Sequence, residues 1–207
     1  MLFRSVAART GDQGKYDELV KSGIVEMVGK QVELKNDILS DGEFWKTRGQ
    51  GYFDSRLTGV ELVPVTDDKP AWLLANQSER CMPEFKDFFA MYYALGNTPM
   101  PGVIIPPATH RHAITGPLKY RGQGTIKHEI EVSKEGIAAA GADLEDFIFP
   151  VLSPGWISHF LWNDYYQTDE EYFYAIADFV KGEYEAVVEA GFVLQIEIGR
   201  ASCRERV

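Results

Sequence analysis

The chain has 207 residues, 45% of them hydrophobic and 25% charged, which is typical of a globular domain large enough to bury a core. Its net charge of −10 and the mixing of basic with acidic residues disfavour a nucleic-acid partner. No apolar run approaches the roughly 20 residues that cross a membrane, and Met1–Arg9 lacks the apolar block of a secretory signal. Cys81 and Cys203 indicate no disulfide framework, so we expect a cytoplasmic protein.

The first third of the chain predicts a helix, a short buried strand and then an irregular aromatic stretch. Tyr16–Leu34 has the apolar spacing of one buried helix face, and Ile38–Leu39 reads as a strand that ends in Ser40-Asp41-Gly42-Glu43. Arg56–Val65 predicts a strand or hairpin, and Pro83–Leu95 predicts a helix. The apolar positions of the first helix are Leu19, Val20, Ile24, Val25, Val28, Val32 and Leu34.

The next part of the chain alternates short strands with a helix. Ala113–Thr115 is an apolar segment that Gly116-Pro117 is expected to close, and Phe147–Leu152 predicts a buried strand closed by Ser153-Pro154-Gly155. Between them lies a predicted helix, Gln123–Ala140. Its packed side is expected to carry Ile126, Ile130, Ile137 and the Ala138–Ala140 run.

The last predicted helix has both of its ends marked in the sequence. Thr168 with Glu171 forms the pattern of a capping box, so a helix is expected over Asp169–Ala190. Gly191 is a natural residue to end it. Phe192–Ile196 then predicts one more buried strand.

Alternation of apolar strands with amphipathic helices predicts an α/β fold with a parallel sheet. A doubly wound sheet would show the same alternation, but no G-x-G-x-x-G follows a strand, and Gly122-Gln123-Gly124 reads as the first turn of a helix. The strands end in polar clusters, DGE, TGP and SPG. In a barrel such strand ends would carry the active site.

The last eleven residues lack the helix and strand patterns of the rest of the chain. Glu197–Val207 reads EIGRASCRERV and shows neither a helical stripe nor strand alternation. It resembles the translation of a common sequencing-adapter oligonucleotide, and a genuine basic tail is the alternative. We therefore expect one domain over residues 1–196 and a foreign tail over 197–207, which removes Glu197 and Cys203 from the candidate site residues.

Four stretches resemble the cobalamin-independent methionine synthase family, and its single-domain branch in particular. These are KYDELVKSGIVEMVGKQVELKNDILSDGEF (Lys15–Phe44), GPLKYRGQ (Gly116–Gln123), FPVLSPGWISHFLWNDYY (Phe149–Tyr166) and DEEYFYAIADFVKGEYEAVVEAGFVLQI (Asp169–Ile196). They occur in the family's order. The resemblance implies a partial (β/α)8 TIM barrel, approximately strands two to five with their helices.

The resemblance also implies a function. The family's zinc activates a thiol, homocysteine, which takes the methyl group of methyltetrahydrofolate to form methionine. The zinc ligands lie on later strands, so we expect Zn²⁺ in the parent enzyme but no ligand in this chain. The family's Gly-Ser-x-Pro-Arg strand is also missing before Lys15. We therefore expect the chain by itself to be inactive and poorly stable, with open sheet edges.

Several residues are expected to bind substrate on the strength of the resemblance. Glu43 matches the glutamate that binds the substrate amine, with Asp41 beside it; the alternative is that both cap the next turn. Gly116, Pro117 and Tyr120 are expected to line part of the pocket, or else to form a tight turn under an aromatic lid.

Three further candidates lie in the later part of the chain. Trp156 and Asn163 belong to an aromatic cluster after the Phe147–Leu152 strand, which either stacks a pterin ring or packs beneath its loop, and Gln195 is expected to face the substrate. The other members of this cluster are His159, Trp162, Tyr165 and Tyr166. His110 and His112 lack a third ligand in a recognisable spacing, so they are not expected to bind zinc, and His128 is expected to be solvated.

Three other functions stay open. A related alkyltransferase could act on another thiol such as coenzyme M, because one barrel hosts many chemistries. A metal-free decarboxylase of the uroporphyrinogen type should crowd arginines at strand ends, where only Arg121 is found, since Arg111 lies on the approach to its strand. The third alternative is a binding module without catalytic activity.

Overall fold

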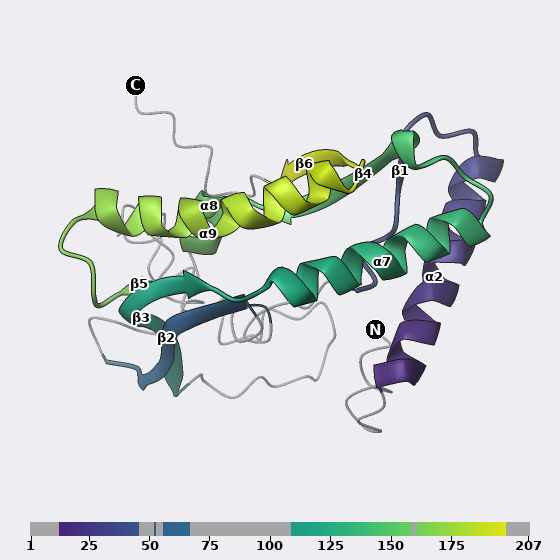
Figure 1. Cartoon of the computed structure of the whole chain (residues 1–207). Coiled ribbons are helices and arrows are strands. Elements are labelled where there is room, and N and C mark those ends of the chain that lie inside the picture. Colours follow the sequence, from purple (N-terminus) through teal and green to yellow (C-terminus); the bar gives the residue numbers. More distant parts are fainter. Residues whose placement is uncertain (1–12, 46–51, 53–55, 67–108, 159–160, 198–207) are drawn as a thin grey trace, which may run out of the picture. The chain divides into compact units, whose positions relative to one another are not determined.

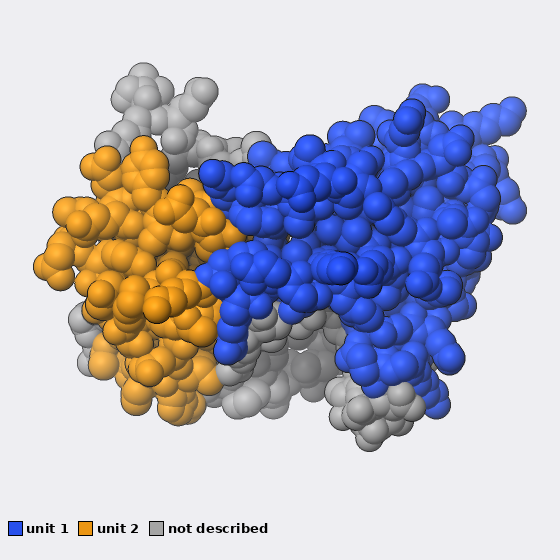
Figure 2. Space-filling model, in the orientation of Figure 1, with its two compact units in different colours: residues 1–56, 120–151, 180–197 blue, residues 57–119, 152–179, 198–207 orange. Residues whose placement is uncertain are grey.

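The computed structural model describes residues 13–45, 52, 56–66, 109–158 and 161–197 (Figure 1). The chain divides into two compact units, coloured separately in Figure 2: unit 1 contains residues 1–56, 120–151 and 180–197, and unit 2 contains residues 57–119, 152–179 and 198–207. None of the helices in these described ranges is long and apolar enough to cross a membrane. The predicted helix Pro83–Leu95 lies outside the described residues.

The elements, in chain order, are α2 (Gln13–Glu33), β1 (Leu39–Ser40), β2 (Leu57–Pro64), β3 (His110–Tyr120), α7 (Gln123–Ala139), the 3₁₀ turn η2 (Leu144–Asp146), β4 (Phe147–Leu152), α8 (Pro154–Ser158), β5 (Trp162–Asn163), α9 (Asp169–Glu189) and β6 (Val193–Glu197).

The sheet of unit 1 has the strand order β1-β4-β6. β1 runs parallel to β4, with Leu39 opposite Phe147 and Ser40 opposite Ile148. The strand β4 has the bounds that its sequence predicts, and its continuous apolar run is buried because helices cover a parallel sheet. Consecutive barrel strands lie side by side, whereas β1 lies next to β4 without β3 between them. The described part of the chain is a mixed α/β fold without a closed barrel.

Helices α2 and α7 pack closely against each other in unit 1. Val20, Ile24 and Val28 of α2 are fully buried, as the helical spacing predicts. A Cβ on Gly136 of α7 would lie 2.7 Å from Cγ2 of Ile24, so the two helices meet at a glycine. The prediction that Val32 and Leu34 share this buried face is wrong. They are 49% and 74% exposed, because they lie more than two turns beyond that contact.

The buried face of α7 is predicted only in part. Ile126, Ile130 and Ile137 are buried, but residues 138 and 139 are exposed and residue 140 is half-exposed. The alanine run was expected on the packed side. It lies instead at the end of the helix, where the chain turns through Gly141 with φ +72°.

The sheet of unit 2 has the order β2-β3-β5. Ala113 and Ile114 of β3 pair in parallel with β5. The strands β2 and β3 are antiparallel, because the Val65 N–H donates to the Thr109 carbonyl at one end (3.1 Å) while the Arg121 N–H donates to the Arg56 carbonyl at the other (2.8 Å).

Gly116 and Pro117 do not close the strand, which corrects the sequence-based expectation. The strand β3 runs through both residues to Tyr120. Proline has no N–H to donate and is tolerated where a strand has a neighbour on one side only, and β5 pairs only with residues 113 and 114. On the other side Gly59, with φ +86°, approaches so closely that a Cβ there would lie 2.5 Å from the Pro117 carbonyl oxygen.

The helix α9 begins and ends as predicted, within one residue. The Glu171 N–H donates to Thr168 Oγ1 (3.1 Å), and Glu171 Oε2 accepts from the Thr168 N–H (3.3 Å), which is a capping box. Gly191 follows the helix with φ +90°. The strand β6 then starts and ends one residue later than its prediction.

Candidate functional site

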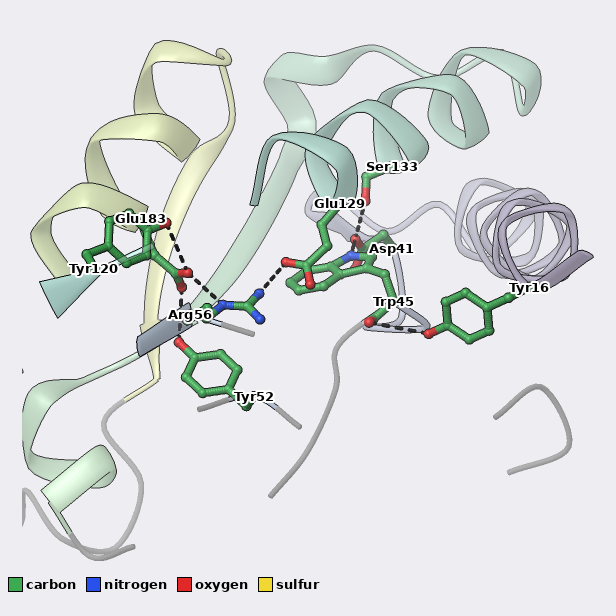
Figure 3. A network of polar contacts seen from close by, with 9 residues as sticks. All are labelled: Tyr16, Asp41, Trp45, Tyr52, Arg56, Tyr120, Glu129, Ser133 and Glu183. Carbon is green, nitrogen blue, oxygen red and sulfur yellow. Dashed lines mark hydrogen bonds and ion pairs between the residues drawn. The ribbon is translucent and has the colours of Figure 1, made fainter. Parts of the chain in front are cut away.

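A tight turn follows β1 and contains the Asp41-Gly42-Glu43 sequence (Figure 3). Asp41 is 1% exposed, and its Oδ1 accepts the Glu43 N–H at 2.9 Å. Its Oδ2 accepts the hydroxyl of Ser133 in α7 at 2.8 Å and the indole N–H of Trp45. Gly42 and Glu43 have φ of +72° and +55°. The carboxylate of Asp41 thus holds a left-handed turn that a residue with a side chain rarely adopts.

The two carboxylates of this turn have different surroundings. Burial raises the pKa of Asp41, and the hydrogen bonds from Trp45, the Glu43 N–H and Ser133 oppose the rise. Glu43 is only half-buried. The geometry of Asp41 matches the alternative in which it caps the turn, and Glu43 is the acid on the turn with its side chain partly open to solvent.

Aromatic side chains pack next to the turn. Trp45 stacks on Phe149 of β4, with ring centroids 4.7 Å apart, and Phe149 packs against Phe192 at 5.1 Å. The hydroxyl of Tyr16 in α2 lies 3.4 Å from the Trp45 carbonyl oxygen. Gln31 donates from its amide to the Ser40 carbonyl oxygen (2.8 Å) and accepts the Ser40 N–H (3.0 Å). Helix, strand and side chains therefore fix the end of β1.

A second polar group in unit 1 surrounds Arg56, which is 1% exposed (Figure 3). Its Nη2 lies 2.5 Å from Oε2 of Glu129 in α7, and its Nε lies 2.6 Å from Oε1 of Glu183 in α9. Its guanidinium carbon is 4.3 Å from the centre of the Tyr52 ring, which is a cation–π contact. We call Tyr52, Arg56, Tyr120, Glu129 and Glu183 the Arg56 cluster.

Two tyrosines complete the Arg56 cluster. Tyr52 donates its hydroxyl to Oε2 of Glu183 at 3.0 Å, and Tyr120, the last residue of β3, donates to Oε1 at 3.3 Å. Burial and the charge of Glu183 raise the pKa of both hydroxyls above the usual value, so both stay protonated. A Cβ on Gly122 would lie 2.5 Å from the Tyr120 ring, so the absence of a side chain there gives the ring its space.

The ionisation of the Arg56 cluster follows from its burial and charge. Burial lowers the pKa of Arg56, but the nearby Glu183 and Glu129 outweigh this and raise it above the usual value. Burial raises the pKa of Glu129 to about 7, although Arg56 lowers it in part. Arg56 is therefore charged, whereas the pKa of Glu129 lies close to neutral pH.

The eight residues that the sequence predicts to bind substrate are divided between the two units. Asp41, Glu43, Tyr120 and Gln195 belong to unit 1, and Gln195 is exposed on β6. Gly116 and Pro117 lie within β3, Trp156 in α8 and Asn163 in β5, all in unit 2. The substrate-binding roles of these residues stay predictions.

The side chain of Asn163 forms hydrogen bonds with the backbone of the loop that follows it. Its Oδ1 accepts the N–H groups of Tyr166 (2.8 Å) and Tyr165 (3.3 Å), and its Nδ2 donates to the Tyr166 carbonyl (3.0 Å). Tyr166 in turn accepts the Leu118 N–H at its hydroxyl, 3.0 Å away. Asn163 and Tyr166 therefore tie their loop to β3 within unit 2, and whether the cluster also stacks a ligand stays a prediction. His159 lies outside the described residues.

Sequence reasoning missed the Arg56 cluster, although a signal was present. Glu129 lies on the same face of α7 as Ile126 and Ile130, and Glu183 lies on the same face of α9 as Val180 and Val187. A charged residue on an apolar helix face is rarely buried without a partner. Two such residues on neighbouring predicted helices indicate a shared buried cation, which the sequence alone does not identify.

Metal ligands are not assembled in the part of the chain that the structure describes. No group of three His, Cys, Asp or Glu side chains there could hold a metal ion. His128 is exposed, as the sequence predicts, and its Nε2 lies 3.1 Å from Oδ1 of Asp17. Arg111, the second residue of β3, is 6% exposed and pairs with Asp164 at 2.6 Å.

Comparison with known proteins finds similarity in structure but not in sequence. No protein-family model and no curated protein matches the chain. A solved structure that matches is the B12-independent methionine synthase from Shewanella sp. W3-18-1, in complex with selenomethionine, with a TM-score of 0.50 and 15% sequence identity. The match covers 86% of this chain and 40% of that protein. The chain thus has a fold similar to part of a methionine synthase and spans less than half of its length.

Proposed function

We propose that this chain is part of a methyltransferase of the cobalamin-independent methionine synthase kind, and that unit 1 binds the amino group of its thiol amino acid. The observation that carries the proposal is the fold similarity over 86% of the chain to such an enzyme. Several motifs, DGE at the end of β1 among them, resemble the family and occur in its order, and this resemblance is a second support for the proposal.

Within this proposal Glu43 binds the substrate and Asp41 positions it. An ammonium group pairs well with a carboxylate at a strand end, because the charge-assisted hydrogen bond is stronger than a neutral one. Asp41 already accepts hydrogen bonds from Ser133, Trp45 and the Glu43 N–H, so it has little capacity for a further ligand. The half-buried Glu43 is therefore our candidate for the contact with the amine.

Zinc and methyltetrahydrofolate remain proposals for the parent enzyme. The described residues offer no three-ligand group for a metal, so they do not fit a zinc site, and we derive no step through it. The partial barrel of approximately strands two to five is likewise an interpretation of the resemblance. No contact among the described residues favours coenzyme M as the thiol, a decarboxylase or a pure binding module over methionine synthesis.

The proposal predicts amino-acid binding without catalysis. L-Methionine and L-homocysteine should bind the purified 207-residue chain in metal-free buffer, and Glu43→Gln should weaken the affinity about tenfold, because the charge-assisted hydrogen bond between the half-buried carboxylate and the ammonium is lost. Isothermal titration calorimetry would measure both affinities. Glu33→Gln, an exposed glutamate of α2, is the matched control and should change nothing.

The competing outcomes are distinct. Equal affinities of the wild type and Glu43→Gln would remove Glu43 from the site but leave amino-acid binding intact. Absence of binding by a folded wild-type chain would contradict the proposal that unit 1 carries the amine site.

A further inference from the structure

The Arg56 cluster contains one more acid than its cation can balance. Arg56 carries one positive charge and contacts two carboxylates, Glu129 at 2.5 Å and Glu183 at 2.6 Å. The side chains of the three residues are 1%, 7% and 2% exposed. With both acids ionised, the buried cluster would carry a net negative charge that no solvent screens.

A buried pair of carboxylates that shares one cation is expected to retain one proton. Glu183 also accepts hydrogen bonds from the hydroxyls of Tyr52 and Tyr120, which stabilise its ionised form. Glu129 has no such tyrosine partner among the hydrogen bonds of the cluster. The proton therefore belongs mainly on Glu129, in agreement with its pKa of about 7.

We propose that the Arg56 cluster is a proton-operated latch, which holds Tyr52 and Arg56 against α7 and α9 while Glu129 carries a proton and loosens when the proton leaves. The latch joins three parts of unit 1 that are distant in sequence: Arg56 lies 73 residues from Glu129 and 127 from Glu183. The latch is also close to the Asp41 turn. Ser133, which donates a hydrogen bond to Asp41, follows Glu129 by four residues and lies on the same face of α7. This inference does not depend on the proposed methyl transfer.

Among the described residues, the groups that act on Glu129 come from several elements. They are Arg56 and Tyr52 from the segment before β2, Tyr120 from β3, Glu183 from α9, and His128 beside it on α7. Glu183 disfavours ionisation of Glu129, whereas Arg56 and His128 favour it. His128 is exposed and lies beside Asp17, so solvent and this carboxylate screen its effect on Glu129.

The direction of the pH effect follows from the raised pKa of Glu129. The folded chain binds a proton at Glu129 that the unfolded chain releases near its usual pKa of about 4.5. The stability that this proton contributes is fully present below that value and is lost as the pH rises through about 7. The latch should therefore be closed at pH 6 and weakened at pH 8.

Trypsin cleavage after Arg56 tests the proposal, because this arginine is 1% exposed and can be cut only when the latch opens. The rate, normalised to a short unstructured peptide at each pH, should rise about tenfold from pH 6 to pH 8 in the full chain. Glu129→Gln, which keeps an acceptor for Arg56 without a charge, should abolish the rise. Glu131→Gln, an exposed glutamate of the same helix, should leave it unchanged.

A carbon-13 titration of the glutamate carboxyl groups gives a second test on the wild-type chain itself. One carboxyl should titrate near neutral pH, and its signal should be absent from Glu129→Gln. A wild-type cleavage rate that does not change between pH 6 and pH 8 would overturn the proposal, as would an equal rise in Glu129→Gln. A variant that fails to fold leaves the wild-type rate and titration as the deciding measurements.

Discussion

Two glycines of the packed helices α2 and α7 occupy different surroundings, although both lie within helices. A Cβ on Gly136 would lie 2.7 Å from Cγ2 and 2.9 Å from Cβ of Ile24, which is fully buried. A Cβ on Gly29 would meet no atom within 4 Å. Glycine at position 136 is therefore a packing requirement, whereas glycine at position 29 only weakens its helix.

The same substitution at these two positions should change stability in opposite directions. Gly136→Ala should lower the free energy of unfolding by about 1–3 kcal/mol, because the new methyl group overpacks the contact with Ile24. Gly29→Ala should raise it by about 0.5–1 kcal/mol through helix propensity. Urea denaturation followed by circular dichroism would measure both. A gain in stability for Gly136→Ala would mean that α2 and α7 leave room for a methyl group at position 136, contrary to the contact with Ile24.

Among the elements, α9 is the one whose start, buried face and end are most clearly marked in its own sequence. Its first turn is capped by Thr168 and Glu171, and its acidic first-turn residues suit the positive end of the helix dipole. Its buried face carries Ile176, Val180 and Val187 at helical spacing. These signals are local in sequence, and for this reason the bounds of the helix were predicted within one residue.

Loss of the cap should destabilise α9. Thr168→Ala removes the acceptor of the Glu171 N–H and should lower the free energy of unfolding by about 0.5–2 kcal/mol. Thr66→Ala is a matched control, since Thr66 is exposed and lies outside the helices and strands. Thermal or urea unfolding would compare the two variants with the wild type. Equal effects of both substitutions would argue against the capping box.

At the scale of the whole molecule, the strand β6 forms one edge of its sheet among the described strands. It ends the strand order β1-β4-β6, and Val193 and Ile196 are 52% and 45% exposed within the described residues. Apolar edge strands promote pairing between molecules, because their N–H and carbonyl groups lack partners. We therefore expect the purified chain to self-associate through this strand.

A charge placed on this edge should reduce self-association. Val193→Lys should raise severalfold the concentration at which static light scattering detects oligomers, because a lysine on the edge must be desolvated when strands pair. Val188→Lys adds the same charge at an exposed position of α9, 58% exposed in the wild type, and should have a smaller effect. Equal effects of the two variants would indicate that net charge, and not the strand edge, controls association.

The sequence by itself determined the local elements and the chemical character of the Asp41 turn. Apolar spacing, the Thr168 cap and Gly191 specify helices and strands, because each signal acts within a few residues. Where a contact between distant residues sets the end of an element, the sequence was not sufficient to predict that end. The strand β3 continues through Gly116-Pro117 because Gly59, more than fifty residues away, approaches its backbone.

Only the tertiary structure decided which polar residues meet. It brings Ser133 and Trp45 to Asp41, so that the carboxylate of this candidate substrate-binding residue instead holds a left-handed turn in place. It also brings Glu129 and Glu183 to Arg56, since their burial depends on how α7 and α9 pack and not on the residues beside them. Such contacts join segments up to 127 residues apart, and local periodicity carries no information about them.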